Sequence, residues 1–226
     1  MSKKSLLVLA VTLSMVAILA IGGTLAYFTD TTDVATNVFT VGDVEIELIE
    51  EFDPNNAVLM PGSKTTNAIN KDVWVENTGA SDAWVRVKLY VPSHLDQLTT
   101  PDYTDEGYLV AAAFNTLHWN TVGANSAIWN VEKANVEATA ITTGEYAGYN
   151  EYVFYYNEIL GVGEKTEQLL DQVYLDSKVD FDGTNYTING QTVDLSKIDI
   201  KIFAEAIQSE GFDTYEAAFA AFDAQN

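Results

Sequence analysis

The chain has no cysteine, which excludes disulfide bonds, thiolate metal ligands and thiol nucleophiles. It has only two histidines, His94 and His118, and lacks the helical His-Glu-x-x-His motif, so a catalytic zinc, which usually takes three protein ligands, has few residues to bind. Neither a glycine-rich phosphate loop nor a Gly-x-Ser-x-Gly elbow occurs. We therefore predict no catalytic residue, metal site or cofactor, with calcium at the acidic segments 50–53, 102–106 and 176–182 as an alternative.

Positive charge is also scarce. Eleven lysines and arginines face 33 acids, for a net charge of −22. Removing residues 1–26, which hold two lysines and no acid, makes the charge −24. Such a chain repels phosphate, which excludes nucleic acid as a partner and disfavours lasting adhesion to anionic membranes. Its content of 47% apolar residues is too high for a disordered acidic tail and predicts a packed core.

The one long hydrophobic run lies at the N-terminus. Residues 6–21 carry no charge and follow Lys3 and Lys4. Two glycines and the small residue Ala26 come next, as in a secretory signal peptide. We predict a signal peptide over residues 1–26, cleaved after Ala26 to leave Tyr27 as the new N-terminus. A retained membrane anchor is the alternative, because residues 5–29 are uncharged and long enough to span a bilayer. Both place the rest of the chain outside the cytoplasm, and membrane contact ends with cleavage.

The body of the chain is rich in strand patterns. Residues 43–50 alternate between apolar and acidic side chains, which is typical of a half-buried strand. Residues 72–76 and 83–91, separated by the turn-forming run 77–82, predict a β-hairpin. In its second strand the alternation directs one set of side chains to the core and the other set to the opposite face: Val85, Val87, Leu89 and Val91 against Trp84, Arg86, Lys88 and Tyr90.

Arg86 is the only arginine in the chain. On the outer face of the predicted hairpin we expect it to pair with Glu76 or to stack on Trp74 or Trp84, in a structural role.

Residues 92–148 are less regular and predict an insertion of loops with a short helix. Further strands are expected at 152–157, 166–175 and 198–208, and Asn189-Gly190 favours a type I′ hairpin turn. Asp213 is expected to cap a C-terminal helix whose buried face holds Ala218, Phe219 and Phe222. The pattern predicts a mainly β fold over residues 43–226, an antiparallel β-sandwich of jelly-roll or Ig-like type with a C-terminal helix.

Residues 22–48, GGTLAYFTDTTDVATNVFTVGDVEIEL, resemble the start of proteins of the TasA/camelysin family. Members carry a Gly-Gly-Thr, a small-residue cleavage site, an aromatic pair with Asp and an Asn-x-Phe-x-x-Gly run before a strand. Residues 75–89, 155–170 and 204–212 are similar to later family segments. The resemblance implies a jelly-roll sandwich, cleavage by a SipW-type signal peptidase, and self-assembly into biofilm-matrix or cell-surface fibres. The sequence leaves open whether such fibres form alone or with a second, accessory fibre protein as a partner.

After cleavage, residues 27–42 form a β-prone segment without proline at a free chain end. We predict that this segment is donated as a strand to a neighbouring copy, burying Val34, Val38, Phe39 and Val41. The alternative is that it forms an ordinary first strand within its own domain.

Two other functions remain open from the sequence. One is a secreted metallopeptidase of camelysin type, which the resemblance carries with it. The other is a monomeric surface-binding module, in which four tryptophans would supply contact area: Trp74, Trp84, Trp119 and Trp129.

Overall fold

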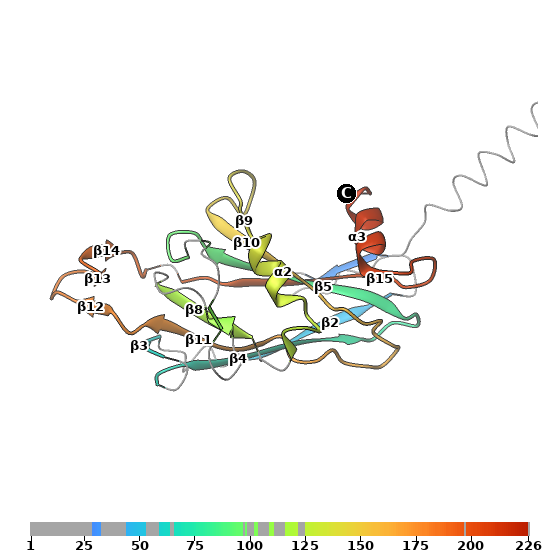
Figure 1. The fold of residues 1–226 in the computed structure, drawn as a ribbon, viewed down its shortest axis with the longest axis horizontal. Helices are drawn as coiled ribbons and strands as arrows, with labels where there is room; N and C mark the ends of the chain where they lie inside the picture. The colour runs from blue at the N-terminus through green and yellow to red at the C-terminus, as the bar shows by residue number, and fades with distance from the viewer. Residues whose placement is uncertain are drawn as a thin grey trace, which may run out of the picture.

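The computed structural model describes residues 29–32, 44–52, 59–63, 66–96, 98, 102–103, 109–110, 116–121, 125–196 and 198–225. Two five-stranded sheets lie face to face in an elongated molecule (Figure 1). The first sheet has the order β1 (Thr29–Thr32), β15 (Lys201–Gln208), β5 (Ala83–Pro92), β10 (Tyr149–Tyr155) and β9 (Thr139–Ala140). The second has the order β2 (Ile46–Glu51), β4 (Ile69–Asn77), β11 (Leu170–Asp176) and β3 (Pro61–Gly62), with β8 (Leu117–Thr121) also paired to β11.

The pairings are antiparallel except that of β11 with β3. One core fills the space between the sheets. Val73 and Val75 of the second sheet and Val85 and Val87 of the first belong to it, and all four are fully buried. The predicted mainly β fold with antiparallel sheets and a C-terminal helix is confirmed.

The predicted hairpin between β4 and β5 is wrong, because the two strands belong to different sheets. β4 pairs with β2 and β11, whereas β5 pairs with β10 and β15. Residues 78–82 therefore cross from one sheet to the other. Buried Asn77 holds this crossing, since its Nδ2 donates to the carbonyl oxygens of Ser81 and Leu160 at 2.9 and 3.0 Å. Crossing lets the apolar faces of the two strands pack on each other instead of lying side by side in one sheet.

The two faces of β5 have different neighbours. The expected inward set, Val85, Val87, Leu89 and Val91, does lie in the core. The opposite face is also largely buried, because the helix α3 (Tyr215–Asp223) packs over Trp84 and Arg86. Further along, Tyr90 is covered by the rings of Tyr146 and Phe203, each 5.0 Å away between centroids.

Part of the segment predicted as an irregular insertion is a buried strand. All five residues of β8 are buried, and Trp119 packs edge to face on Tyr152 and Phe154 of the first sheet. Leu117, His118, Trp119 and Asn120 alternate between apolar and polar side chains, which is a short strand signal that the prediction of an irregular insertion overlooked. The expected short helix exists as α2 (Val131–Val136), and the short strands β6 (Asp102–Tyr103) and β7 (Leu109–Val110) pair with each other.

After β11 the chain forms a small three-stranded sheet that projects from one end of the molecule (Figure 1). Its strands are β12 (Val179–Phe181), β13 (Tyr186–Ile188) and β14 (Gln191–Val193). The predicted tight turn between β13 and β14 is confirmed, since Asn189 and Gly190 have φ of 49° and 79°.

The helix α3 starts one residue later than expected. Its N-cap is Thr214, not Asp213, and the Thr214 hydroxyl accepts a hydrogen bond from the Ala217 N–H at 3.3 Å. Thr214 has the extended backbone that an N-cap residue takes. The predicted buried face of Ala218, Phe219 and Phe222 is confirmed.

Candidate functional site

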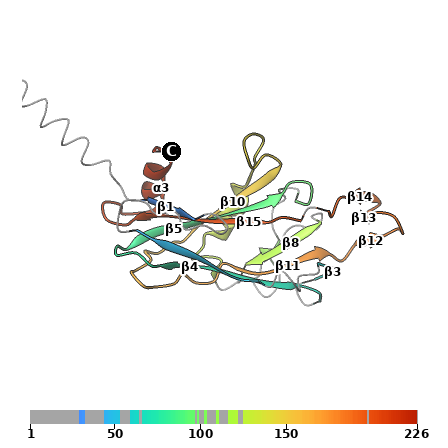
Figure 2. The same cartoon turned by 180° about the vertical axis from the view of Figure 1, so that it is seen from behind.

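β1, the first strand of the described residues, forms one edge of the first sheet. β1 runs antiparallel to β15 with Thr29 opposite Ile207 and Thr32 opposite Ala204, so it spans four of the eight residues of β15. Figure 2 shows β1 beside β15 at the end of the molecule that carries α3. The other side of β15 pairs with β5 over its whole length. A four-residue edge strand makes few ladder hydrogen bonds, each contributing about 0.5–1.5 kcal/mol, so it is the part of the sheet that opens at least cost.

Arg86 of β5 connects this edge to α3. Its Nε donates to a carboxylate oxygen of Glu205 on β15, and its Nη1 donates to Asp223 of α3 at 2.9 Å. The guanidinium also lies 4.5 Å from the ring centre of Phe219 and 5.1 Å from that of Phe222. Arg86 thus joins β5, β15 and α3, and the side chain is almost fully buried.

The protonation states follow from these contacts. Burial by itself lowers the pKa of Arg86, but the bonds to Asp223 and Glu205 outweigh it and hold the pKa above its ordinary value. The Arg86 guanidinium holds the pKa of Asp223 below its usual range, with burial opposing this shift. Both groups are therefore charged near neutral pH. The expected pairing of Arg86 with Glu76 is wrong: Glu76 instead meets Lys165 at 3.3 Å.

The two histidines are far from alike. His118 on β8 is buried, with its Nε2 2.8 Å from an Asp176 carboxylate oxygen and its ring stacked on Tyr174 at 5.0 Å. His94 lies exposed after β5, with its Nε2 3.1 Å from the carbonyl oxygen of Asp194. His118 is thus a packed residue with a carboxylate partner.

Several carboxylates of the acidic segments singled out for calcium have protein partners. Glu50 forms an ion pair with Lys71 at 2.8 Å. Asp182 accepts hydrogen bonds from the backbone N–H groups of Thr184 and Asn185, which lower its pKa. Residues 53, 105 and 106 of these segments lie outside the described part of the chain.

The tryptophans do not form a contact surface. Trp84, Trp119 and Trp129 are buried, and Trp129 donates its indole N–H to the carbonyl oxygen of Glu167 at 2.8 Å. The prediction that they supply contact area for a ligand is wrong for these three, because the core and α3 cover them. Trp74 is half-buried.

The exposed aromatic side chains in the described residues are Phe52, Phe181 and Tyr186. Sequence reasoning missed the last two, although the alternation of Val179 with Phe181 and of Tyr186 with Ile188 is a signal that could have found them.

The predicted cleavage residues Ala26 and Tyr27 lie outside the described residues, and so do the predicted assembly residues Val34, Val38, Phe39 and Val41. These stay predictions. In the parts of the chain that are described, neither the length nor the hydropathy of any helix suffices for crossing a bilayer.

The profile of the camelysin metallo-endopeptidases matches residues 2–114, which is half of the chain. The chain belongs to the camelysin metallo-endopeptidase family. The matched half of this camelysin-family protein runs from the predicted signal peptide through β1, β2, β4 and β5. No curated protein and no solved structure matches the chain.

The family name implies a catalytic metal, and the described residues of this camelysin-family chain do not fit one. A catalytic zinc usually takes three protein ligands and an open position. His118 and Asp176 form the one close pairing of a histidine with a carboxylate that the described contacts provide, and they are bonded to each other. No group of three or more His, Asp or Glu residues there is placed to hold a metal ion.

Proposed function

We propose that this protein is exported and assembles with copies of itself into fibres in the extracellular matrix or at the cell surface. The observation that carries the proposal is the position of β1. This strand starts three residues after the predicted cleavage site at Ala26 and closes the edge of the first sheet over only four residues. Family membership supports the proposal, because the chain shares its N-terminal half with camelysins.

The proposed mechanism is strand exchange. In the monomer β1 lies on its own β15, and in the fibre it would lie on β15 of the next copy. Exchanging identical elements replaces each ladder hydrogen bond with an equivalent one, so the exchange costs little. Burial of Val34, Val38, Phe39 and Val41 against the neighbour would add about 1.5–3 kcal/mol each, in favour of the polymer. A signal-peptidase cut of SipW type would release the segment and start assembly, and a second fibre protein would act as a nucleating partner.

The main experiment compares the processed chain, starting at Tyr27, with a variant that lacks residues 27–38. N-terminal sequencing of the exported protein first verifies the start. Negative-stain electron microscopy and size-exclusion chromatography should show long fibres for the processed chain and a folded monomer for the deletion variant. Normal fibres from the deletion variant would reject strand exchange. A processed chain that stays monomeric at all protein, salt and calcium concentrations would reject self-assembly.

The second candidate is a secreted metallo-endopeptidase, which the family name favours. It predicts casein cleavage that stops with a chelator, and about one zinc per chain by mass spectrometry. The fibre proposal predicts neither.

A further inference from the structure

The small sheet has one apolar face that is only partly covered. Across its three strands Phe181 lies opposite Tyr186, and Tyr186 lies opposite Val193. Nearer to the sandwich, Val179 and Ile188 pair on the same face and belong to the main core. Further out, Phe181 is 53% exposed and Tyr186 44% exposed, with their rings 5.1 Å apart. The apolar face therefore starts in the core and continues into solvent, where an isolated soluble domain would be expected to carry polar residues.

A second exposed apolar pair lies in the loop 157–164. Ile159 is 47% exposed and Val162 is 51% exposed. The loop is held firmly: Leu160 and Ala83 exchange two backbone hydrogen bonds of 2.8 and 3.0 Å, and the Gly163 N–H donates to the carbonyl oxygen of Asn77. Its apolar side chains are thus displayed from a fixed backbone.

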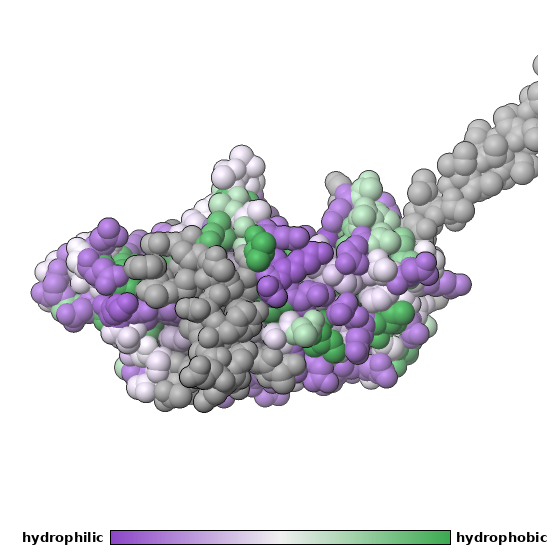
Figure 3. Space-filling model, viewed as in Figure 1, coloured by the Kyte–Doolittle hydropathy of each residue, from purple (hydrophilic) through white to green (hydrophobic). Residues whose placement is uncertain are grey.

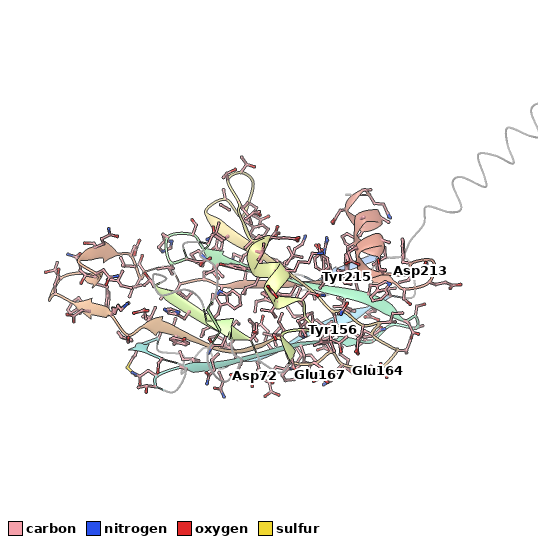
Figure 4. All side chains as sticks on the ribbon, viewed as in Figure 1. Asp72, Tyr156, Glu164, Glu167, Asp213 and Tyr215 are labelled. Atoms are coloured by element: carbon pink, nitrogen blue, oxygen red, sulfur yellow. The ribbon has the colours of Figure 1, made fainter. Side chains whose placement is uncertain are left out.

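The two pairs lie at opposite ends of the molecule. The loop 157–164 is bonded to the end of β4 and the start of β5, whereas the small sheet follows the end of β11, which runs antiparallel to β4. Figure 4 labels Glu164 of this loop toward the end where Tyr215 and Asp213 lie, away from the small sheet. Among the coloured atoms of Figure 3, hydrophilic residues and several hydrophobic areas lie side by side between the ends.

We propose that Phe181 and Tyr186 of one copy pack on Ile159 and Val162 of the next copy, in a head-to-tail contact between fibre subunits. The inference rests on the proposed self-assembly and adds a second contact to the exchanged strand. Two unlike patches at opposite ends of one chain form a heterologous interface, which repeats without closing and generates a filament.

The size of the patches favours a second copy already held by another contact. A buried Phe or Tyr covers 150–250 Å², so about half exposure leaves roughly 100 Å² on each ring. With a matching area on the partner, the contact buries roughly 400 Å², well below the roughly 1,200 Å² of a stable interface. The contact cannot hold two free proteins together, but it can strengthen a junction that an exchanged strand already makes.

The charges beside the patches are compatible with this contact. Lys178 and Asp180 flank the aromatic pair, and Glu164 and Lys165 follow the aliphatic pair. The Lys165 side chain is 51% exposed, pairs with Glu76 at 3.3 Å and lies 5.7 Å from the ring centre of Trp74. Each end therefore offers one lysine to a carboxylate of the other end, so that two ion pairs can form across the contact.

The test measures the critical concentration of polymerisation of the processed chain by sedimentation. One variant carries Phe181→Ser and Tyr186→Ser, and a second carries Ile159→Ser and Val162→Ser. Each should raise the critical concentration about 10- to 100-fold, as loss of one or two contact side chains does. The control Val136→Ser removes an even more exposed apolar side chain, 73% exposed on α2, and should change nothing.

A variant with all four substitutions decides whether the patches touch each other. If they do, the second pair of substitutions adds little, because the same junction is already lost. The contact would be overturned if the quadruple variant raised the critical concentration by the product of the two pair effects, or if either pair variant left it unchanged. In both cases, fibres of the unmodified chain would leave the proposed function standing. An unmodified chain that never polymerises overturns both. Thermal unfolding verifies that each variant is folded. If a pair variant does not fold, the single substitution Tyr186→Ser or Val162→Ser replaces it in the same test.

Discussion

The outer face of the first sheet and the apolar face of the small sheet both carry large apolar side chains, but another element of the chain covers only the first of them. Both present large apolar side chains away from the space between the two main sheets. On the first sheet α3 covers Trp84 and Ile207, so that both are buried. On the small sheet the row of Phe181 and Tyr186 stays about half exposed. A covered face contributes to folding of the chain, whereas an uncovered face can contribute only when another molecule binds it.

The largest test of this comparison is the same substitution on both faces. Phe219→Ala in α3 should lower the free energy of unfolding by about 3–5 kcal/mol, because the ring is almost fully buried. Phe181→Ala should lower it by less than about 1 kcal/mol, because half of the ring already contacts water. Urea unfolding below the critical concentration measures both. Equal losses would mean that the two faces do not differ in the monomer.

The charged contact under α3 should be the next largest effect. Arg86→Met keeps packing against Phe219 but leaves buried Glu205 with Lys88 as its cation, at 3.0 Å. Losing one partner of a buried pair should cost about 2–4 kcal/mol in urea unfolding. Lys165→Met removes the exposed pair with Glu76 and should cost less than about 1 kcal/mol. An unchanged free energy of unfolding in Arg86→Met would show that apolar packing alone holds α3.

The turn of the small sheet should show a smaller, local effect. Gly190→Ala places a side chain at φ 79° and should cost about 1–2 kcal/mol. The substitution should then accelerate amide hydrogen exchange in β13 and β14 relative to the unmodified protein, and leave exchange in β5 as it was. Asn189 also has a positive φ, which glycine adopts readily, so Asn189→Gly should leave hydrogen exchange unchanged. Uniformly faster exchange after Gly190→Ala would show that the small sheet is not a separate unit of stability.

The smallest expected effect concerns acid. The pKa of Asp223 is lowered by Arg86 from an ordinary value of 3.8, so its contribution to stability is present above about pH 4 and is lost as the pH falls through the lowered pKa. Asp223→Asn should therefore flatten the acid-side loss of stability below pH 4. The change should be under about 1 kcal/mol, because the Asp223 side chain is 56% exposed. Parallel pH curves for both proteins would contradict the role of this pair.

Local patterns predicted much of the fold. The alternation in residues 43–50 identified β2, Asn189-Gly190 identified the turn between β13 and β14, and the spacing of Ala218, Phe219 and Phe222 identified the buried face of α3. Each of these signals lies within a few residues of the structure that it specifies. The strand β8 was missed although Leu117 and Trp119 alternate with polar residues, because the alternating run is short and lies in a segment rich in turn-forming residues.

The candidate site was less predictable. The sequence predicts a cleavage site shortly before β1, but the pairing of β1 with β15 joins residues more than 170 positions apart. The partners of Arg86 are equally remote, since Glu205 and Asp223 approach it only when β15 and α3 are in place. The alternation of residues 179–181 and 186–188 could have placed Phe181 and Tyr186 on one face of a small sheet, but it could not show that no other element covers that face.

The sequence by itself determined where strands, the tight turn and the C-terminal helix form, because these depend on side-chain periodicity and on backbone preferences of neighbouring residues. It also carried the family resemblance that the profile match confirms. Tertiary structure decided which strands share a sheet, which partners neutralise Arg86 and which aromatic side chains reach solvent. Hydrogen bonds and apolar contacts between distant segments set these outcomes, and a local pattern is compatible with several such pairings until the whole core has packed.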